Sequence, residues 1–276
     1  MSIIQGTAKS GGSTSFYDYP IENSLRFDGS STLTRTPNQT GNLGIWTSSF
    51  WIKRSTLNSS TQSVFDARPS SSLSNSNLTN MYFKASDDSL VLGGYSSDWR
   101  ETTAVYRDLS SWFHVVVSFD ISTSTKSITI YVNGVIISSF TTNNNPTGTT
   151  GGYNQQNPHT IGGCCNGSAS FRGYLANFQF IDGQALDQYF FGEFKDNIWV
   201  PYNAFSTAGS GTATASDGDT ATDSYGTNGF RLAFESADFN WSGSSTMTDP
   251  YGSGTAVPIY GVADASGNGK HWVMNS

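Results

Sequence analysis

The sequence predicts an all-β protein in which two antiparallel sheets pack against each other, with almost no helix. Many short segments alternate apolar and polar side chains, which is the period of a strand and not of a helix. The spacers between them are rich in Gly, Ser, Thr and Asn, residues that favour turns. Only 13% of the residues are charged while 14% are aromatic, so the fold depends on aromatic burial more than on ion pairs. About a dozen short strands at this spacing favour a sandwich over an open barrel.

The clearest local prediction is a three-stranded meander. Phe113–Asp120 places Phe and Val side chains on one face, and Lys126–Val132 does the same with Ile and Val. Asn133-Gly134 then supplies the two positive-φ positions of a tight hairpin turn. Val135–Phe140 is expected to run back as the third strand. We expect the apolar face of this meander to lie in the core.

Further strands are expected on both sides of the meander, each a short run bounded by turn residues. They are Ser24–Asp28, Thr32–Arg35, Leu43–Arg54, Gln62–Ala67, Met81–Lys84, Ser89–Leu92, Thr102–Tyr106, His159–Gly163, Phe171–Asp182 and Gly229–Phe234. A turn or two of helix is expected at Asp187–Phe194. A Gly-pinned turn within Asp264–Trp272 leads into a last short strand.

The strand expected at residues 43–54 is long and has two different faces. Phe50 and Ile52 share one face, whereas Trp51 and Lys53 lie on the other. Because of its length, we expect this strand to be bent or bulged at Thr47–Ser49.

Composition divides the chain into four segments. Residues 1–20 are rich in Gly, Ser and Thr and are expected to form a flexible N-terminal arm. Residues 21–205 carry most of the predicted strands and are expected to form the sandwich. Residues 206–224 are a low-complexity stretch typical of a linker or surface loop. Residues 225–276 are expected to pack on the sandwich or to complete it.

Charge and hydropathy argue against several kinds of partner. The formal net charge is −7 and no basic run occurs, which argues against nucleic acid. No apolar stretch approaches the length needed to cross a membrane, and the first residues lack the charged and apolar regions of a signal peptide. We therefore expect synthesis in the cytosol, without a cleaved signal and without membrane insertion. Cys164 and Cys165 are adjacent, which excludes a disulfide framework.

Several motifs together resemble a known family. Trp112-Phe-His-Val, Ile130-Tyr-Val-Asn-Gly and Phe171-x-Gly-Tyr-Leu resemble the laminin G-like, or concanavalin A-like, jelly roll. A wider set, spread over residues 22–276, resembles one branch of that superfamily, found in virion structural proteins of tailed phages of marine and freshwater bacteria. That set is Ser24–Phe27, Leu33–Pro37, Trp46–Arg54, Phe180–Leu186, Phe191–Glu193, Tyr225–Phe230 and Asp264–Gly269 with Trp272.

The resemblance implies a two-sheet antiparallel jelly-roll sandwich with a structural and adhesive role. We expect a virion protein, made in the host cytoplasm and displayed on a tail fibre, a head fibre or the capsid surface. Its expected partners are other virion proteins, copies of itself and host-surface polysaccharide. The alternative is a free-standing carbohydrate-binding, lectin-like module.

An enzyme is not expected. Retaining glycosidases on this fold carry carboxylates with a spacing like Glu-x-Asp-x-x-Glu. The nearest run, from Glu235 to Asp238, lacks that alternation. His114, His159 and His271 lie far apart in the sequence, without the spacing of metal ligands. A polysaccharide-cleaving enzyme is therefore only a third alternative.

Calcium is the one cofactor for which the sequence offers a site. Asp217, Asp219 and Asp223 supply three oxygen ligands in one loop, and hard cations bind such clusters. The alternative is a solvated acidic loop, because no bidentate Glu completes the set.

Aromatic residues in polar loops are candidates for a glycan or receptor site, because such a site requires an exposed aromatic platform beside polar groups. Tyr95, Trp99 and Tyr153 are the aromatics that strand alternation explains least, and binding residues concentrate in loops. The alternative is that these rings pack beneath their loops.

The arm has its own aromatic cluster. Phe16, Tyr17 and Tyr19 precede Pro20 and are expected to anchor the arm to the virion or to sister subunits. A disordered leader is the alternative.

Overall fold

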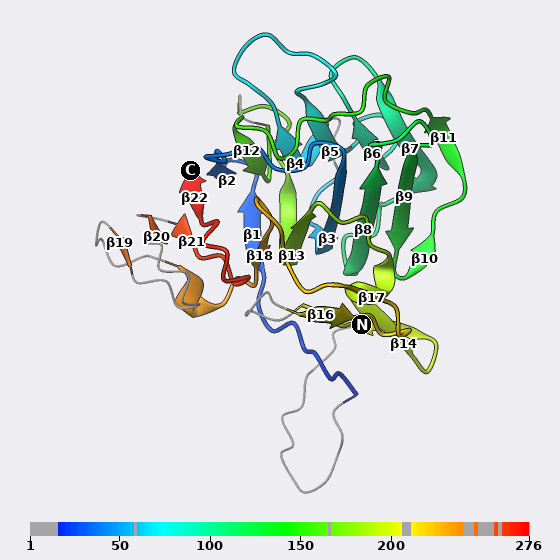
Figure 1. Ribbon diagram of the computed structural model, residues 1–276, viewed down its shortest axis with the longest axis vertical. Coiled ribbons are helices and arrows are strands. Elements are labelled where there is room, and N and C mark those ends of the chain that lie inside the picture. The colour runs from blue at the N-terminus through cyan, green and yellow to red at the C-terminus, as the bar shows by residue number, and fades with distance from the viewer. Residues whose placement is uncertain are drawn as a thin grey trace, which may run out of the picture.

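The computed structural model describes residues 16–57, 60–164, 167–205, 211–239 and 261–275, and the short strands at 246–247 and 257–258. Within these residues the chain forms two large antiparallel sheets and three two-stranded sheets (Figure 1). The predicted all-β jelly-roll sandwich is confirmed. Helix in the described part of the chain is limited to two 3-10 turns, η1 (Gln188–Phe190) and η2 (Ser236–Asp238).

The strands of each sheet come from distant parts of the sequence. The first sheet has the order β1 (Leu25–Asp28), β13 (Arg172–Asp182), β3 (Ile45–Arg54), β8 (Phe113–Asp120), β9 (Ser127–Val132) and β10 (Val135–Ile136), and β18 (Phe230–Leu232) also pairs with β13. The second has the order β11 (Phe140–Asn143), β7 (Asp98–Val105), β6 (Ser89–Gly93), β5 (Thr79–Phe83), β4 (Gln62–Ala67), β12 (His159–Ile161), β2 (Thr32–Arg35), β22 (Trp272–Asn275) and β21 (Gly261–Val262). The small sheets pair β14 (Gly192–Lys195) with β15 (Ile198–Pro201), β16 (Thr212–Thr214) with β17 (Thr220–Thr222), and β19 (Thr246–Met247) with β20 (Val257–Pro258).

The core lies between the two large sheets and is built largely from aromatic side chains. Trp46 of β3 stacks on Phe119 of β8 with ring centroids 4.5 Å apart. Phe65 of β4, in the other sheet, stacks on Tyr153 at 4.3 Å, and all four rings are fully buried. Successive residues of a strand point to opposite faces. Side chains of β3 and β8 that alternate with these core residues therefore lie on the outer face of the first sheet.

Part of that outer face is covered by a second apolar cluster. Val116 of β8 and Ile181 of β13 point outward into it, and described residues of the segments 186–205 and 213–225 pack over them. The members from those segments are Leu186, Phe190, Phe191, Phe205, Ala213, Ala215 and Tyr225. Trp51 of β3 lies on the neighbouring part of the same face.

Two local predictions are confirmed only in part. The meander is confirmed through β8 and β9, but its return strand β10 has two residues, and Phe140 already belongs to β11 in the other sheet. Strand β3 pairs with β8 without a shift along residues 45–52, so the bulge expected at Thr47–Ser49 is not in β3. The extra residue lies in the partner strand β13, between Ala176 and Gln179, where Asn177 has a φ of 45°. Asn tolerates this left-handed conformation, which makes a bulge there inexpensive.

Other segments differ in extent from their predictions. The helix expected at Asp187–Phe194 is only η1, and β14 begins at residue 192. Residues 212–222, within the stretch expected as a linker or surface loop, form β16 and β17, while residues 206–210 lie outside the described residues. In the C-terminal segment, β18 pairs with β13, β22 with β2 and β21 with β22, so the first large sheet gains one strand from it and the second gains two (Figure 1). Among the described residues no helix has the length and hydropathy to span a membrane.

Candidate functional site

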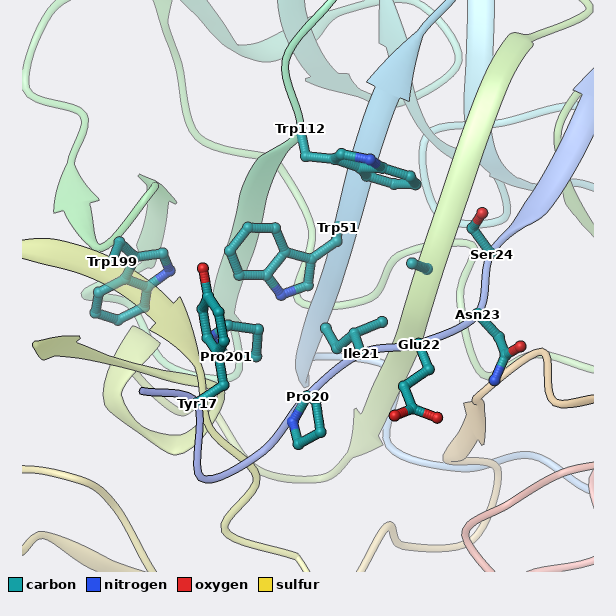
Figure 2. A pocket seen from close by; sticks show the side chains of 11 residues that line it. Tyr17, Pro20, Ile21, Glu22, Asn23, Ser24, Trp51, Trp112, Trp199 and Pro201 are labelled. Carbon is teal, nitrogen blue, oxygen red and sulfur yellow. The ribbon is translucent and has the colours of Figure 1, made fainter. Parts of the chain in front are cut away.

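A cavity of about 450 Å³ on the outer face of the first sheet is lined by three tryptophans (Figure 2). Trp51 comes from β3, Trp112 from the position before β8, and Trp199 from β15. Figure 2 shows Trp51 in the middle, Trp112 above it, Trp199 to its left and Tyr17 below. We call this cavity the tryptophan pocket.

Strand alternation places Trp51 in the pocket. Its neighbours Phe50 and Ile52 are fully buried in the core, so the side chain between them points to the outer face. Across the sheet Trp51 is paired with His114 on one side and with Ala176 on the other. The Trp51 ring stacks on the His114 imidazole with centroids 4.9 Å apart. Ala176 also lines the pocket, and its short side chain leaves space beside the indole.

His114 holds two of the three tryptophans in place. The Trp199 indole Nε1 donates a hydrogen bond to His114 Nδ1 over 3.0 Å. Because Nδ1 accepts, the ring proton is on Nε2, which donates to Ser49 Oγ at 2.8 Å. Burial lowers the pKa of His114 to about 3, so the ring is neutral at physiological pH and keeps both hydrogen bonds.

Two glycines make room for the Trp199 ring. A Cβ atom at Gly134, in the turn between β9 and β10, would lie 2.2 Å from the ring, and one at Gly192 would lie 2.1 Å from it. Gly134 also has a φ of 75°, which the tight turn requires. The Trp199 indole is therefore fixed before any ligand arrives.

Trp112 and Trp51 present the surface that a ligand can reach. The Trp112 side chain is 37% exposed and Trp51 is half-buried, whereas Trp199 is 9% exposed. The Nε1 donor of Trp51 has no hydrogen-bond partner among the described residues. A buried donor without a partner costs about 1–3 kcal/mol.

One wall of the pocket is a segment of extended chain, residues 17–24, which we call the strap (Figure 2). Asp18 forms an ion pair with Lys195 of β14. The Tyr19 hydroxyl accepts a hydrogen bond from Arg231, whose guanidinium lies 5.5 Å from the Tyr19 ring centroid. Burial raises the pKa of Tyr19, so the phenol stays neutral in this contact.

These contacts correct the expectation that the aromatic residues near the N-terminus are free to dock elsewhere. Tyr17 lines the tryptophan pocket and Tyr19 packs on Arg231, so both find partners within this chain. The Phe16 side chain is 41% exposed, and its ring centroid lies 5.1 Å from that of Tyr17. Residues 1–15 lie outside the described residues. Attachment to a virion through residues 1–20 stays a prediction.

A second hollow, of about 580 Å³, lies on the other side of the strap. We call it the polar hollow because its lining is mainly polar. It shares Pro20, Ile21, Glu22 and Asn23 with the tryptophan pocket, and adds Tyr19, Asn177, Arg231, Ala233, Glu235 and Ser236. Arg231 Nε donates to Asn177 Oδ1 at 2.9 Å, so the guanidinium is held from both the strap and β13.

The family model of the concanavalin A-like lectin/glucanases superfamily matches residues 28–188 of this chain. The chain belongs to this superfamily. Trp51 and Trp112 lie inside the matched region, whereas the strap, Trp199 and Arg231 lie outside it. The tryptophan pocket thus combines strands of the superfamily domain with segments that precede and follow it.

Three solved structures are similar to this chain at low identity. A putative carbohydrate binding protein from Bacteroides ovatus ATCC 8483 is 13% identical over 92% of this chain and 58% of that chain, with a TM-score of 0.51. An SAP-like pentraxin from Limulus polyphemus is 23% identical over 59% of this chain and 76% of that chain, with a TM-score of 0.42. The CBM40 of a Ruminococcus gnavus IT-sialidase is 12% identical over 60% of this chain and 92% of that chain, with a TM-score of 0.43. No curated protein matches the chain.

In this concanavalin A-like sandwich, the loop aromatics expected to form an exposed platform do not lie together on the surface. Tyr95 is 54% exposed in the turn between β6 and β7, but Trp99 and Tyr153 are fully buried in the core, so their expected exposure is wrong. Strand β7 starts at residue 98 and draws Trp99 inward. The Tyr153 hydroxyl donates to the Phe65 carbonyl oxygen at 2.8 Å beneath its loop. A glycan or receptor role for Tyr95 stays a prediction.

The sequence did contain a signal for part of the tryptophan pocket. Alternation in residues 43–54 already directed Trp51 to the face opposite Phe50 and Ile52. No comparable pattern marks Trp112, which precedes its strand, or Trp199, whose partner His114 is 85 residues away.

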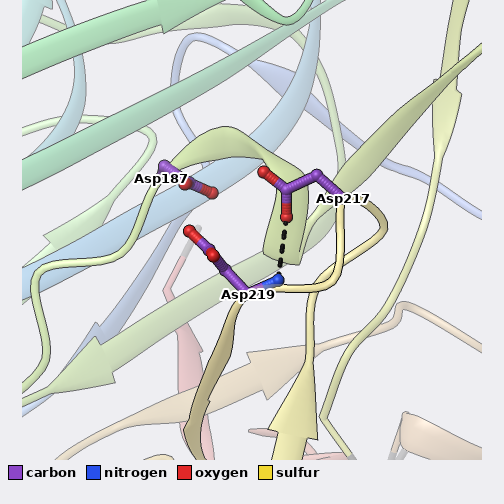
Figure 3. Close-up of side chains that lie close together, drawn as sticks. All are labelled: Asp187, Asp217 and Asp219. Atoms are coloured by element: carbon purple, nitrogen blue, oxygen red, sulfur yellow. Dashed lines mark hydrogen bonds between the residues drawn. The ribbon is translucent and has the colours of Figure 1, made fainter.

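An acidic group at one end of this superfamily fold partly matches the predicted calcium site (Figure 3). Carboxylate oxygens of Asp187, Asp217 and Asp219 lie within 4.8 Å of one another. Asp223 was the expected third ligand, but it is 5% exposed and is not part of the group, so that assignment is wrong. Asp187, which precedes η1, takes its place.

The acidic group has the chemistry of a hard-cation site. Asp219 donates its backbone N–H to Asp217 Oδ1 at 3.2 Å, and Asp187 Oδ1 accepts from the Tyr189 N–H at 2.9 Å. Burial, and the negative charges of Asp217 and Asp219, raise the pKa of Asp187. Three carboxylates suit Ca²⁺, which prefers oxygen ligands. Calcium binding itself stays a prediction.

Proposed function

We propose that this chain is a glycan-binding module and that the tryptophan pocket is its binding site. The observation that carries the proposal is the pairing of half-exposed Trp51 and Trp112 over a rigid floor. Binding pockets for small ligands are typically lined by aromatic side chains with a few well-placed polar groups. Flat indole faces suit the apolar faces of sugar rings.

Rigidity favours binding at this pocket. The Trp199 ring is held by His114 and two glycines, and the Trp51 ring is stacked on His114. A ligand that docks there orders few side chains, so little of its interaction energy is lost to conformational entropy. The similar fold of the Bacteroides ovatus protein, described as a putative carbohydrate binding protein, agrees with this proposal.

A glycan array followed by calorimetry on the strongest ligand tests the proposal. Trp112→Ala should weaken binding at least about tenfold, because aromatic anchors contribute about 1.4 kcal/mol or more. Tyr95→Ala is the matched control, since it also removes an exposed aromatic ring but lies outside the pocket. Equal losses in the two variants, or a loss only in Tyr95→Ala, would contradict the assignment.

The proposal extends to the particle that carries the module. The set of motifs shared with tailed-phage structural proteins supports a place on the virion surface, on a tail fibre, a head fibre or the capsid, where glycan binding would attach the phage to its host. Other virion proteins and sister copies are the proposed partners. Quantitative mass spectrometry of purified virions tests this, because a virion part occurs at a fixed copy number per particle. If the protein is absent from washed particles, the free-standing lectin-like module is the better interpretation.

The proposed role is binding without cleavage. Glu22 and Glu235 are the carboxylates among the described residues that line the two hollows, and only Glu22 borders the tryptophan pocket. Incubation of the protein with a polysaccharide that it binds should release no reducing ends. Release that is abolished by Glu22→Gln or by Glu235→Gln would contradict this and assign a hydrolase.

A further inference from the structure

The tryptophan pocket and the polar hollow lie on the two flanks of one strap. Residues 20–23 of the strap line both hollows, so only this one segment of chain separates them. Figure 2 shows Ile21 directed toward Trp51, while Glu22 and Asn23 point away from the tryptophans. Beneath the strap the floor continues from Ala176 to the next residue of β13, Asn177, which lines the polar hollow.

The two hollows offer complementary chemistry. The tryptophan pocket offers flat apolar rings. The polar hollow offers an amide, a guanidinium, carboxylates and a hydroxyl, from Asn177, Arg231, Glu22, Glu235 and Ser236. Such groups donate to and accept from hydroxyls. A chain of sugars presents both kinds of surface at every ring.

We propose that the site binds an internal stretch of a linear, uncharged polysaccharide. One sugar stacks in the tryptophan pocket, the chain crosses the strap, and a further sugar is hydrogen-bonded in the polar hollow. This inference rests on the proposed glycan-binding function and specifies its ligand.

The strap is suited to serve as the ridge between two sugar subsites because it is fixed on the polar side and at its start. Arg231 contacts the ring and hydroxyl of Tyr19, and Lys195 pairs with Asp18. A ridge that is already ordered adds contact area without an entropy cost at the moment of binding.

The part of the first sheet that lies beneath the strap is also shaped to form the two hollows. Ala176 and Ala233 line the tryptophan pocket and the polar hollow respectively, and each keeps its floor low. Between the two hollows, the bulge in β13 holds Asn177 at a φ of 45°, with its Oδ1 on Arg231 Nε. Bulges of this kind redirect a side chain and are common next to functional sites.

The charges select an uncharged ligand. Glu22 is the one charged residue in the lining of the tryptophan pocket. In the polar hollow Arg231 is outnumbered by Glu22 and Glu235, and two of its N–H donors already serve Asn177 and Tyr19. The whole chain has a net charge of −7. The carboxylates of uronic or sialic acids would be desolvated here against like charge, which is unfavourable.

A chain-length series tests the inference. Calorimetry would use neutral gluco-, galacto- and manno-oligosaccharides of increasing length, with oligogalacturonides of the same lengths as the charged counterparts. In at least one neutral series the affinity should rise about tenfold or more once the chain is long enough to reach the second hollow, because a linked second contact adds to the first. The oligogalacturonides should not bind.

Two variants locate the second subsite. Ser236→Trp, at an exposed position bordering the polar hollow, should abolish the gain with length while leaving the short sugars bound as in the wild type. Ser124→Trp, exposed in the loop between β8 and β9 and outside both hollows, is the matched control and should leave both unchanged. Melting temperatures confirm that both variants are folded.

The possible failures are distinct. Affinity that depends on Trp112 but not on chain length, or a length gain that survives in folded Ser236→Trp, would overturn the two-subsite inference and leave the proposed function standing. Trp112-dependent binding of oligogalacturonides would overturn the assignment of an uncharged ligand. Absence of binding to every sugar would overturn the proposed function itself.

Discussion

Acid should destabilise this protein at a pH well above that at which carboxylates titrate, because two histidines are buried in the neutral form. Burial lowers the pKa of His114 and of His159 to about 3. In His159, Nε2 accepts from the Asn154 backbone N–H at 3.1 Å, so the proton is on Nδ1, which donates to the Asn157 carbonyl oxygen at 2.7 Å. As in His114, one ring nitrogen faces a donor, and protonation would break that hydrogen bond.

The sign follows from proton binding in the two states. In the unfolded chain a histidine has a pKa of about 6.5. As the pH falls below this value the unfolded state binds protons that the folded state does not, so the free energy of unfolding decreases. This contribution is fully present above about pH 6.5 and is lost progressively toward pH 3, where the folded pKa values lie.

The magnitude is large relative to the stability of a domain. As the pH falls below about 6.5, each buried histidine lowers the free energy of unfolding by about 1.4 kcal/mol per pH unit. Between about pH 7 and about pH 4.5 the two histidines together lower it by about 5 kcal/mol. Total stabilities are about 5–15 kcal/mol. Asp182 and Asp187, whose pKa values burial raises, offset part of the loss at the acid end of this range.

Urea unfolding at a series of pH values across this range, followed by tryptophan fluorescence, measures the slope. His114→Gln and His159→Gln each remove one titrating group, and each should roughly halve the dependence of the unfolding free energy on pH. The comparison uses the slope, so a variant that is less stable at every pH is still informative. A wild-type unfolding free energy that is constant from about pH 7 to about pH 4.5, or a slope that neither substitution changes, would refute the reasoning.

Three further predictions concern the core, the N-terminal segment and the acidic group. Val117→Asp places a carboxylate in the core, where Val117 is fully buried, and should cost several kcal/mol; thermal melting within a few degrees of wild type would show that this face of β8 is not core. Deleting residues 1–15 should leave melting and glycan affinity unchanged, because the strap is retained. Deleting residues 1–20, which also removes Phe16, Tyr17 and Tyr19, should abolish incorporation into virions. Deleting residues 1–24 should in addition weaken glycan binding, because this removes a wall of both hollows; calorimetry that shows equal affinity would contradict the role of the strap. Adding Ca²⁺ should raise the wild-type melting temperature by mass action, and should do so less in Asp219→Asn, whereas no shift in the wild type would exclude a calcium site.

The alternation of apolar and polar side chains predicted the strands of the sandwich, because this alternation depends only on residues that are neighbours in the sequence. The burial of Phe50 and Ile52 and the outward position of Trp51 follow from the two-residue period of β3. Trp99 was misassigned because β7 begins earlier than its alternation indicates, which turns a loop residue into a core residue. Strand boundaries are set by pairing with other strands, and a local pattern does not contain that information.

The candidate site depends on contacts between distant residues, so most of it could not be predicted. The hydrogen bond from Trp199 to His114 joins residues 85 positions apart, and the contact from Arg231 to Tyr19 joins residues 212 positions apart. The acidic loop was recognised through Asp217 and Asp219 because they are neighbours in sequence. Asp187 lies beside them because Tyr189 of η1 accepts a hydrogen bond from the backbone N–H of Ser216, which precedes Asp217.

The most direct test of the tryptophan pocket is the response of the indole N–H groups to a glycan. The chain has seven tryptophans, and an isotope-edited NMR spectrum resolves each indole N–H as a separate signal. With the strongest ligand from the array, we expect the Trp51 and Trp112 signals to shift most, because these two rings line the tryptophan pocket and are the more exposed of its tryptophans. The signals of the core residues Trp46, Trp99 and Trp272 should stay in place. Saturating glycan that leaves the Trp51 and Trp112 signals unmoved while shifting resonances elsewhere would contradict the account.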